Sequence, residues 1–390
     1  MLQTNHLSIY RKSTGQTLLK DFTFSLNAGE RIAIVGEEGN GKSTLLKLLF
    51  DPALVEPYAE WEGDIRREGK LGYLSQELSY DDCPLTAYEY LSRSGVFDFA
   101  DAGDLAQLSG ELGISAELPY TDQTVGTLSG GEKVKLQLLR ILAHRPDTLL
   151  LDEPTNDIDI ETLEWMERFL LSCRVPVLYI SHDETLLERT ATGIIHIEQL
   201  RTKTECRHTI SRVPYRAYVD ERLRALSHQS QMARKEKDEY DAQMERYRHI
   251  YERVHHEQNA ISRGNPSGGR LLKKKMHAVK SMERRFEREK QDMTQKPVTE
   301  DAILLSLPEV SLPSGKEILR FNLSELIAGG AVLARNVTLS VTGAERIGII
   351  GRNGAGKTTL LAAIAEQLLS RADIRAFYMP QDYAALLPAG

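Results

Sequence analysis

Lys42 and Ser43 close a glycine-rich stretch whose residue types could hold a phosphate group. The stretch consists of Gly36, Glu37, Glu38, Gly39, Asn40, Gly41, Lys42, Ser43 and Thr44, with apolar runs on both sides. Glycines let the backbone turn so that N–H groups converge on an anion, and a helix beginning there adds its positive dipole end. The lysine can reach the β- and γ-phosphates, and the serine hydroxyl can ligate Mg²⁺. The spacing fits a P-loop in full; a glycine-rich turn without a ligand is the alternative.

Four further motifs that could serve nucleotide hydrolysis follow along the chain. Gln76 ends a short strand, and Ser129, Gly130, Gly131 and Glu132 open a helix, again a place suited to phosphate. Asp152 and Glu153 end a buried strand, where Asp152 would hold Mg²⁺ and Glu153 would deprotonate the attacking water. Gln76 could meet the ion and that water. His182 follows another buried strand and could contact the γ-phosphate, although alone it would more often be structural.

Tyr10 is a candidate for binding the base of a nucleotide. It lies 26 residues before Gly36, in a segment that alternates apolar and polar residues as strands do. Stacking on adenine and an ordinary aromatic residue in a strand are equally consistent with this pattern.

Together these motifs resemble the ATP-binding cassette (ABC) ATPase domain over residues 1–205. Leu-Ser-Gly-Gly-Glu, ending at Glu132, is the most specific of them. The resemblance implies an α/β P-loop fold in which Gly36 to Ser43 is Walker A, Ser129 to Glu132 the signature, and Asp152 with Glu153 Walker B. Gln76 takes the Q-loop position and His182 the switch position. ATP and Mg²⁺ are the implied cofactors.

Residues 206–298 change character and predict a helical hairpin. Apolar residues recur every seventh position from Val219 to Val254, and again from Leu272 to Met293, with a Gly/Pro-containing break between them. Residues 261–285 contain one acid and eight bases: Arg263, Arg270, Lys273, Lys274, Lys275, Lys280, Arg284 and Arg285. A solvated face is one explanation. Because the whole chain has a net charge of −7, we favour contact of this tip with an RNA phosphate backbone.

Residues 299–390 begin a second cassette that repeats the first. The second P-loop lies 315 residues after the first and consists of Gly351, Arg352, Asn353, Gly354, Ala355, Gly356, Lys357, Thr358 and Thr359. Thr358 would ligate Mg²⁺ as Ser43 does. Phe377 to Gln381 matches the strand that ends in Gln76, so Gln381 is the second Q-loop candidate. A second signature, Walker B pair and switch histidine do not occur within the 390 residues.

Two cassettes joined by a helical hairpin resemble the ABC-F family. The resemblance implies an ATPase that binds the ribosome, with its linker near rRNA and tRNA, acting as a translation factor or in antibiotic resistance by ribosome protection. The alternative is the ATP-binding subunit of a membrane transporter. A DNA-associated ATPase is a third interpretation, but its coiled coil would interrupt one cassette rather than join two.

Composition agrees with a cytoplasmic protein of two or three domains. The chain is 41% apolar, has three scattered cysteines, and contains no apolar run long enough for a membrane helix or signal peptide. Because each ATP in this family lies between the P-loop of one cassette and the signature of the other, we expect weak hydrolysis by these 390 residues. Head-to-tail self-association of two first cassettes would provide a complete site.

Overall fold

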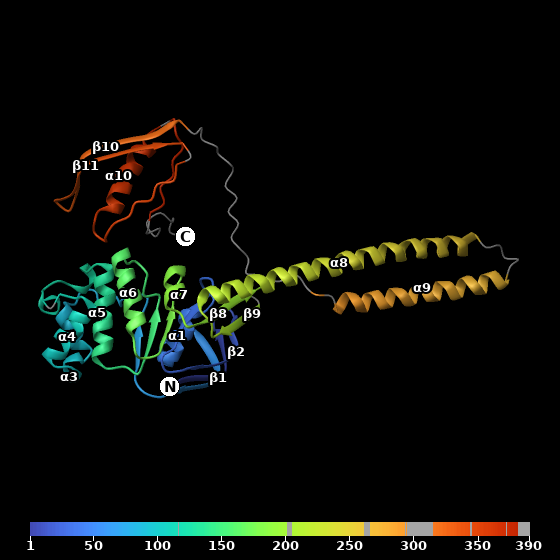
Figure 1. The fold of residues 1–390 in the computed structure, drawn as a ribbon, viewed down its shortest axis with the longest axis horizontal. Helices are drawn as coiled ribbons and strands as arrows, with labels where there is room; N and C mark the ends of the chain where they lie inside the picture. The colour runs from blue at the N-terminus through green and yellow to red at the C-terminus, as the bar shows by residue number, and fades with distance from the viewer. Residues whose placement is uncertain are drawn as a thin grey trace.

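The computed structural model describes residues 1–115, 117–200, 205–260, 266–292, 294, 315–343, 345–371 and 373–380. Figure 1 shows an α/β unit, a long helical hairpin that projects from it, and a second, smaller α/β unit. The prediction of an α/β ABC cassette with a helical linker and part of a second cassette is confirmed.

The central sheet of the first unit has six strands in the order β5-β6-β7-β3-β8-β9. Their bounds are β3 (Arg31–Val35), β5 (Leu71–Leu74), β6 (Thr148–Asp152), β7 (Val177–Ile180), β8 (Gly193–Leu200) and β9 (Glu205–Ser211). The first five are parallel, and β9 pairs antiparallel with β8. Because β9 belongs to this sheet, the first unit extends past the predicted boundary at residue 205.

An antiparallel sheet packs beside the central one. It consists of β1 (Leu2–Arg11), β2 (Thr17–Leu26) and β4 (Ala59–Arg67), with β1 in the middle. Alternating apolar residues such as Phe22 and Leu26 turn inward and join Leu45 of the P-loop helix and Ile34 of β3 in one buried cluster. This shared core fixes the P-loop between the two sheets.

Helices flank the central sheet and form a separate helical region. The helices are α1 (Lys42–Phe50), α2 (Ala87–Arg93), α3 (Val96–Phe99), α4 (Ala102–Leu112), α5 (Gly130–Ala143), α6 (Ile160–Ser172) and α7 (Glu184–Thr190). Short 3-10 turns cover Pro52–Leu54, Leu118–Tyr120 and Val125–Thr127. A buried cluster containing Leu136, Leu139 and Met166 attaches α5 and α6 to the sheet, so the amino ends of both helices are held in place.

The hairpin consists of α8 (Tyr215–Ala260) and α9 (Pro266–Asp292) (Figure 1). At 1.5 Å per residue α8 is roughly 69 Å long. The predicted heptad residues Tyr247 and Val254 of α8 pack against Val279 and Phe286 of α9. The glycine-containing break is shorter than expected, because Pro266 to Gly269 already lie in α9; proline is compatible with a helix's first turn.

The second unit contains β10 (Glu317–Ala328), β11 (Ala331–Thr342) and α10 (Lys357–Leu369). The strand expected before its P-loop is not formed: residues 345–350 have no regular structure, and Ile350 is 81% exposed. Phe377 to Pro380 likewise form no strand, and Gln381 lies outside the described residues. In the first unit β3 is a strand because β7 and β8 pair with it. Among the described residues, the segment before the second P-loop has no such neighbours.

Candidate nucleotide site

The predicted site residues of the first unit meet at one edge of the central sheet. Strands β3, β5, β6 and β7 are parallel, so the P-loop, Gln76, the two carboxylates and His182 all follow their carboxyl ends. Gly36 has φ 145°, and a Cβ there would lie 2.1 Å from the Ile197 carbonyl oxygen. Only glycine fits this close approach of the P-loop to β8.

The P-loop holds its lysine and serine ready for a phosphate. Lys42 Nζ donates to the carbonyl oxygens of Gly36 and Glu37 at 2.7 and 2.8 Å. Ser43 Oγ donates to Asp152 Oδ1 at 2.9 Å. These contacts lie within the loop and at its floor.

Asp152 lies fully buried at the floor of this site. Burial raises its pKa, while hydrogen bonds from Ser43 and Tyr73 oppose that rise. Tyr73 Oη donates to Asp152 Oδ2 at 3.2 Å. Sequence reasoning missed this tyrosine; its place in the strand that ends near Gln76 was the available signal.

Three side chains hold Glu153, one from its own loop and two from distant segments. Gln76 Nε2 donates to Glu153 Oε2 at 3.2 Å, and Asn156 Nδ2 donates to the same oxygen at 2.6 Å. His182 Nε2 lies 3.5 Å from Oε1. The residue has a left-handed backbone, with φ 48°, a costly conformation that clusters at functional sites. The structure thus brings Gln76, Glu153 and His182 together, and adds Asn156.

A pocket of about 330 Å³ lies over this P-loop. It is lined by Arg11, Glu38, Gly39, Gly41, Lys42, Ser43, Thr44, Gln76 and Glu153. Arg11 at the end of β1 is therefore among the described lining residues, whereas its neighbour Tyr10 is not. Asn40 is almost fully buried and donates to the Ile197 carbonyl oxygen at 3.0 Å, so its side chain anchors the loop to β8.

The signature residues occupy the amino end of α5. Ser129 caps this helix: its Oγ accepts from the Glu132 backbone N–H, and the Glu132 carboxylate accepts from the Ser129 backbone N–H at 2.9 Å. Gly130 packs against the 155–159 loop, since a Cβ there would lie 2.2 Å from the Asp157 carbonyl oxygen. The signature is thus a rigid surface beside that loop.

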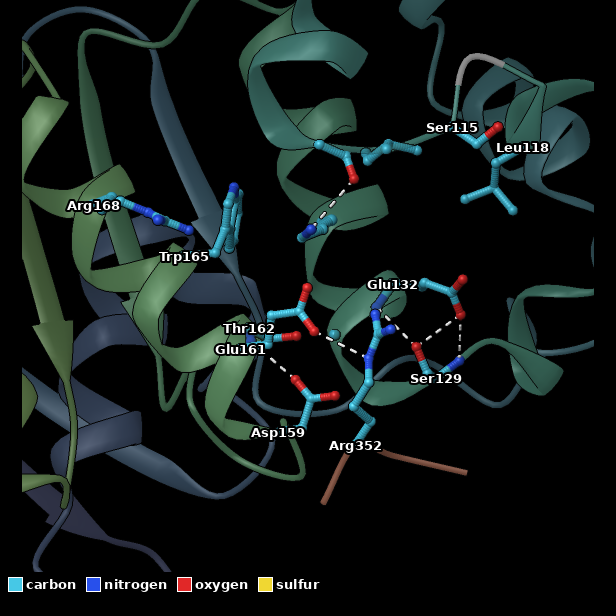
Figure 2. A pocket seen from close by; sticks show the side chains of 14 residues that line it. Ser115, Leu118, Ser129, Glu132, Asp159, Glu161, Thr162, Trp165, Arg168 and Arg352 are labelled. Atoms are coloured by element: carbon cyan, nitrogen blue, oxygen red, sulfur yellow. Dashed lines mark hydrogen bonds and ion pairs between the residues drawn. The ribbon is translucent and has the colours of Figure 1, made fainter. Parts of the chain in front are cut away.

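The second P-loop lies against this signature surface rather than against the first P-loop. A pocket of about 290 Å³ lies here, and its lining includes Ser129, Glu132 and Arg352; Figure 2 shows these side chains. The second loop has the backbone of the first: Lys357 Nζ donates to the carbonyl oxygens of Gly351 and Arg352 at 2.8 and 2.7 Å. Gly354 and Gly356 share the left-handed φ of their counterparts, and Thr358 and Thr359 lie in α10.

A charged cluster joins the first unit to the hairpin. His196 Nδ1 and the Tyr218 hydroxyl are 2.7 Å apart, and Arg222 forms an ion pair with Glu198, whose side chain is 2% exposed. Burial lowers the pKa of His196 to about 4. The carbonyl of Ile197, between the two β8 partners, accepts from Asn40 of the P-loop. Strand β8 therefore contacts both the start of α8 and the P-loop.

Exposed bases are spread along α9, from the turn-proximal Lys273 to Arg285 in the second half of the helix. Lys273, Lys274, Lys275, Lys280 and Arg285 are exposed, and Lys275 Nζ lies 3.8 Å from Glu257 of α8. Arg270 and Arg284 also lie in α9, and Arg263 lies outside the described residues. Within the part of the chain that the structure describes, no helix is long and apolar enough to cross a membrane.

Comparison with known proteins identifies the cassettes. The ABC transporter family model matches residues 19–156 and 334–375, which include both P-loops. The chain is 26% identical to ABC transporter F family member 5 of Arabidopsis thaliana, over 97% of this chain and 58% of the relative. It belongs to the ABC-F family. As an ABC-F protein it contains an ATP-binding ABC ATPase domain.

Two bacterial relatives show how much of an ABC-F protein is present. The chain is 28% identical to the putative ATP-binding protein YdiF of Bacillus subtilis, over 94% of this chain and 58% of the relative. It is 29% identical to the ribosome protection protein VmlR of Bacillus subtilis, over 90% of this chain and 59% of the relative. The chain thus spans somewhat more than half the length of these curated relatives.

Proposed function

We propose that the first unit, predicted as residues 1–205 and completed by β9, is an ATPase cassette that hydrolyses ATP at the first P-loop. Glu153 carries this proposal, because Gln76, Asn156 and His182 all lie within contact of its carboxylate. A carboxylate so oriented can deprotonate a water next to the γ-phosphate. Lys42, the P-loop N–H groups and Thr44 would bind the phosphates. His182 would contact the γ-phosphate.

The oxygen donors at the floor of this pocket fit Mg²⁺. Ser43 Oγ and Asp152 Oδ1 are 2.9 Å apart, and Gln76 lines the same pocket. Hydroxyl, carboxylate and amide oxygens are the ligands that this hard cation prefers, with water completing the shell. When bound, Mg²⁺ would neutralise phosphate charge; Thr358 would serve the second P-loop in the same way.

We propose a second, composite nucleotide site between the two P-loop-containing units. Its P-loop would be Gly351 to Thr359, and Ser129 to Glu132 would close it from the opposite side. Support comes from the shared pocket of Ser129, Glu132 and Arg352 (Figure 2). Residues 299–390 would then act as part of a second cassette, with Gln381 as its Q-loop residue.

We propose that residues 206–298 direct the ATPase to the ribosome, in the cytoplasm, as a translation factor or in ribosome protection. The observation that carries this is the long hairpin with exposed lysines near its turn, far from the first unit (Figure 1). Spacing bases along a projecting arm suits contact with RNA phosphates. The ribosome protection named for VmlR, a relative of 29% identity, agrees with this.

The ribosome proposal is tested by measuring ribosome binding against salt concentration. Each phosphate contact by a lysine releases counterions, so affinity should fall steeply as salt rises. Changing Lys273, Lys274 and Lys275 to Gln should weaken binding and reduce the slope by about 2 to 3. ATP binding by the isolated protein should be unchanged.

A matched control removes three charges elsewhere on the hairpin. Arg234, Lys235 and Lys237 are exposed on α8, away from the turn, and their change to Gln should leave the slope close to the parent's. Equal effects of the two triple variants would contradict a role for the tip. Sedimentation of the protein with membranes rather than ribosomes would favour the transporter interpretation.

A further inference from the structure

Two residues of the second P-loop, Arg352 and Asn353, contact the first unit. Arg352 Nε lies 3.0 Å from the Glu161 carboxylate at the start of α6, and a dashed line marks this ion pair in Figure 2. The Asn353 backbone N–H donates to Asp159 Oδ2 at 3.2 Å, and its side-chain Nδ2 donates to the Asp157 carbonyl oxygen at 2.7 Å. We call Asp157, Asp159 and Glu161 the acidic docking edge. It requires positive charge and N–H donors from its partner.

The first P-loop has the same backbone but the opposite side chains at these two positions. In both loops the lysine donates to the carbonyl oxygens of the first two loop residues. The 315-residue repeat aligns Glu37 with Arg352 and Glu38 with Asn353. A first P-loop docked on the same edge would place a Glu37 carboxylate against Glu161. Glu38 could not donate a side-chain hydrogen bond to the Asp157 carbonyl.

We propose that these two positions select which P-loop docks on the acidic docking edge. The edge accepts the second P-loop of its own chain through Arg352 and Asn353. It rejects the first P-loop of another copy, because Glu37 and Glu38 bring like charge and no side-chain donor. Specificity of this kind needs a repulsive element against the wrong partner as well as an attraction to the right one. Head-to-tail pairing of first cassettes is thereby disfavoured.

This inference deepens the proposed composite site and rests on it, but its two positions can be tested without nucleotide. The distance between the units is measured by pulsed electron paramagnetic resonance on the full 390-residue chain. Spin labels are placed at Ser172→Cys on α6 and Ala362→Cys on α10, both exposed, with Cys83, Cys173 and Cys206 changed to Ala. Arg352→Glu and Glu161→Arg should each lower the ratio of docked to open molecules about fivefold, as for exposed charge pairs.

Combining Arg352→Glu with Glu161→Arg restores opposite charges and should recover most of the docked population. Glu164→Arg makes the same charge change on an exposed position one turn along α6 and should leave the distance unchanged. Failure of the charge swap to restore docking, or an equal effect of Glu164→Arg, would overturn the pairing. ATP binding, followed separately with a fluorescent analogue, reports on the nucleotide sites themselves.

The selection against the first P-loop is tested by sedimentation over a range of protein concentrations. Arg352→Glu frees the edge, and the protein should stay monomeric because Glu37 and Glu38 remain. Adding Glu37→Arg and Glu38→Asn gives the first P-loop the pattern of the second and should produce a dimer. Adding Glu161→Arg as well should abolish that dimer. Dimerisation of the Arg352→Glu protein alone, or no dimer in the triple variant, would refute the selection rule.

Discussion

At the scale of single residues, the first nucleotide site depends on how Glu153 is held. Hydrogen bonds from Gln76 and Asn156 converge on one carboxylate oxygen, and His182 approaches the other. A side chain fixed from both sides can keep its orientation when water and phosphate enter. Asp152, although adjacent in sequence, lies on the floor with Ser43 and Tyr73, so the two carboxylates have separate sets of neighbours.

Glu153→Gln should bind ATP with affinity close to the parent's and lose turnover by about 10² to 10⁴-fold, because an amide is a far poorer base. The measurement is phosphate release under saturating ATP, in a longer form of the protein with both signatures. Glu164→Gln, on exposed α6, is the control and should turn over normally. Lys42→Ala should instead weaken ATP binding. Undiminished turnover by Glu153→Gln would remove the residue from the mechanism.

Arg11, rather than Tyr10, is among the residues that line the first pocket. A guanidinium can stack on a base through its planar face. We expect Arg11→Ala to weaken ATP binding about three- to tenfold, an effect of cation–π size, with inorganic tripolyphosphate affected less. Tyr10→Ala is the matched comparison. Equal losses for ATP and tripolyphosphate would show that Arg11 contacts phosphates, and a larger loss with Tyr10→Ala would restore the original prediction.

At the scale of elements, the sequence predicted those features that depend on the spacing of residues within a single segment. The P-loops, the capped helix at Ser129 and the heptads that pair Tyr247 with Phe286 all follow from spacing within one segment. Features that depend on distant partners were missed. Tyr73 acquires its contact with Asp152 only because β5 and β6 are neighbours, and the segment before Gly351 has strand-forming residues but no described strand to pair with. Asn156 lies only three residues from Glu153, so it was missed although its contact is local.

The contact between β8 and α8, made by His196 with Tyr218 and by Glu198 with Arg222, should become less stable in mild acid. We call it the β8–α8 joint. Burial depresses the pKa of His196 to about 4 in the folded state, against about 6.5 in an unfolded chain. The unfolded form therefore binds more protons between these values, and stability falls as pH drops from about 6.5 towards 4. The pKa of Glu198 is also lowered, chiefly by its hydrogen bond from Arg222 against the effect of burial. Its contribution is lost at lower pH still.

Amide hydrogen exchange of residues 215–226, corrected for the pH dependence of intrinsic exchange rates, measures how often the start of α8 opens at the β8–α8 joint. The protection factors should decline about tenfold or more as the pH falls from about 6.5 towards 4, the range set by His196. His196→Gln should make this decline smaller. His249→Gln, at an exposed position farther along α8, should retain the parent's pH dependence. An unchanged profile in His196→Gln would mean that another group controls the joint.

At the scale of the whole molecule, the signature and Glu153 line pockets that belong to different P-loops. Ser129 and Glu132 share a pocket with Arg352 of the second loop, whereas Glu153 lies in the pocket of the first. The Leu-Ser-Gly-Gly-Glu sequence occurs once in the 390 residues. Within one polypeptide of these residues, the second P-loop lies beside the signature and the first P-loop lies beside Glu153. Among the residues that the structure describes, neither pocket contains a P-loop, a signature and a Walker B glutamate together.

We accordingly expect the 390-residue polypeptide to bind ATP and to hydrolyse it slowly. Its rate should rise in proportion to protein concentration, because Glu37 and Glu38 oppose the pairing of first cassettes that would complete a site. The triple variant Glu37→Arg, Glu38→Asn, Arg352→Glu should instead show a steeper than linear rise, since each first cassette would then offer a signature to its partner. Phosphate release from micromolar to tens of micromolar protein, with sedimentation on the same samples, distinguishes these cases. Fast, linear hydrolysis by a proven monomer of the parent would show that one cassette completes the reaction without an opposing signature.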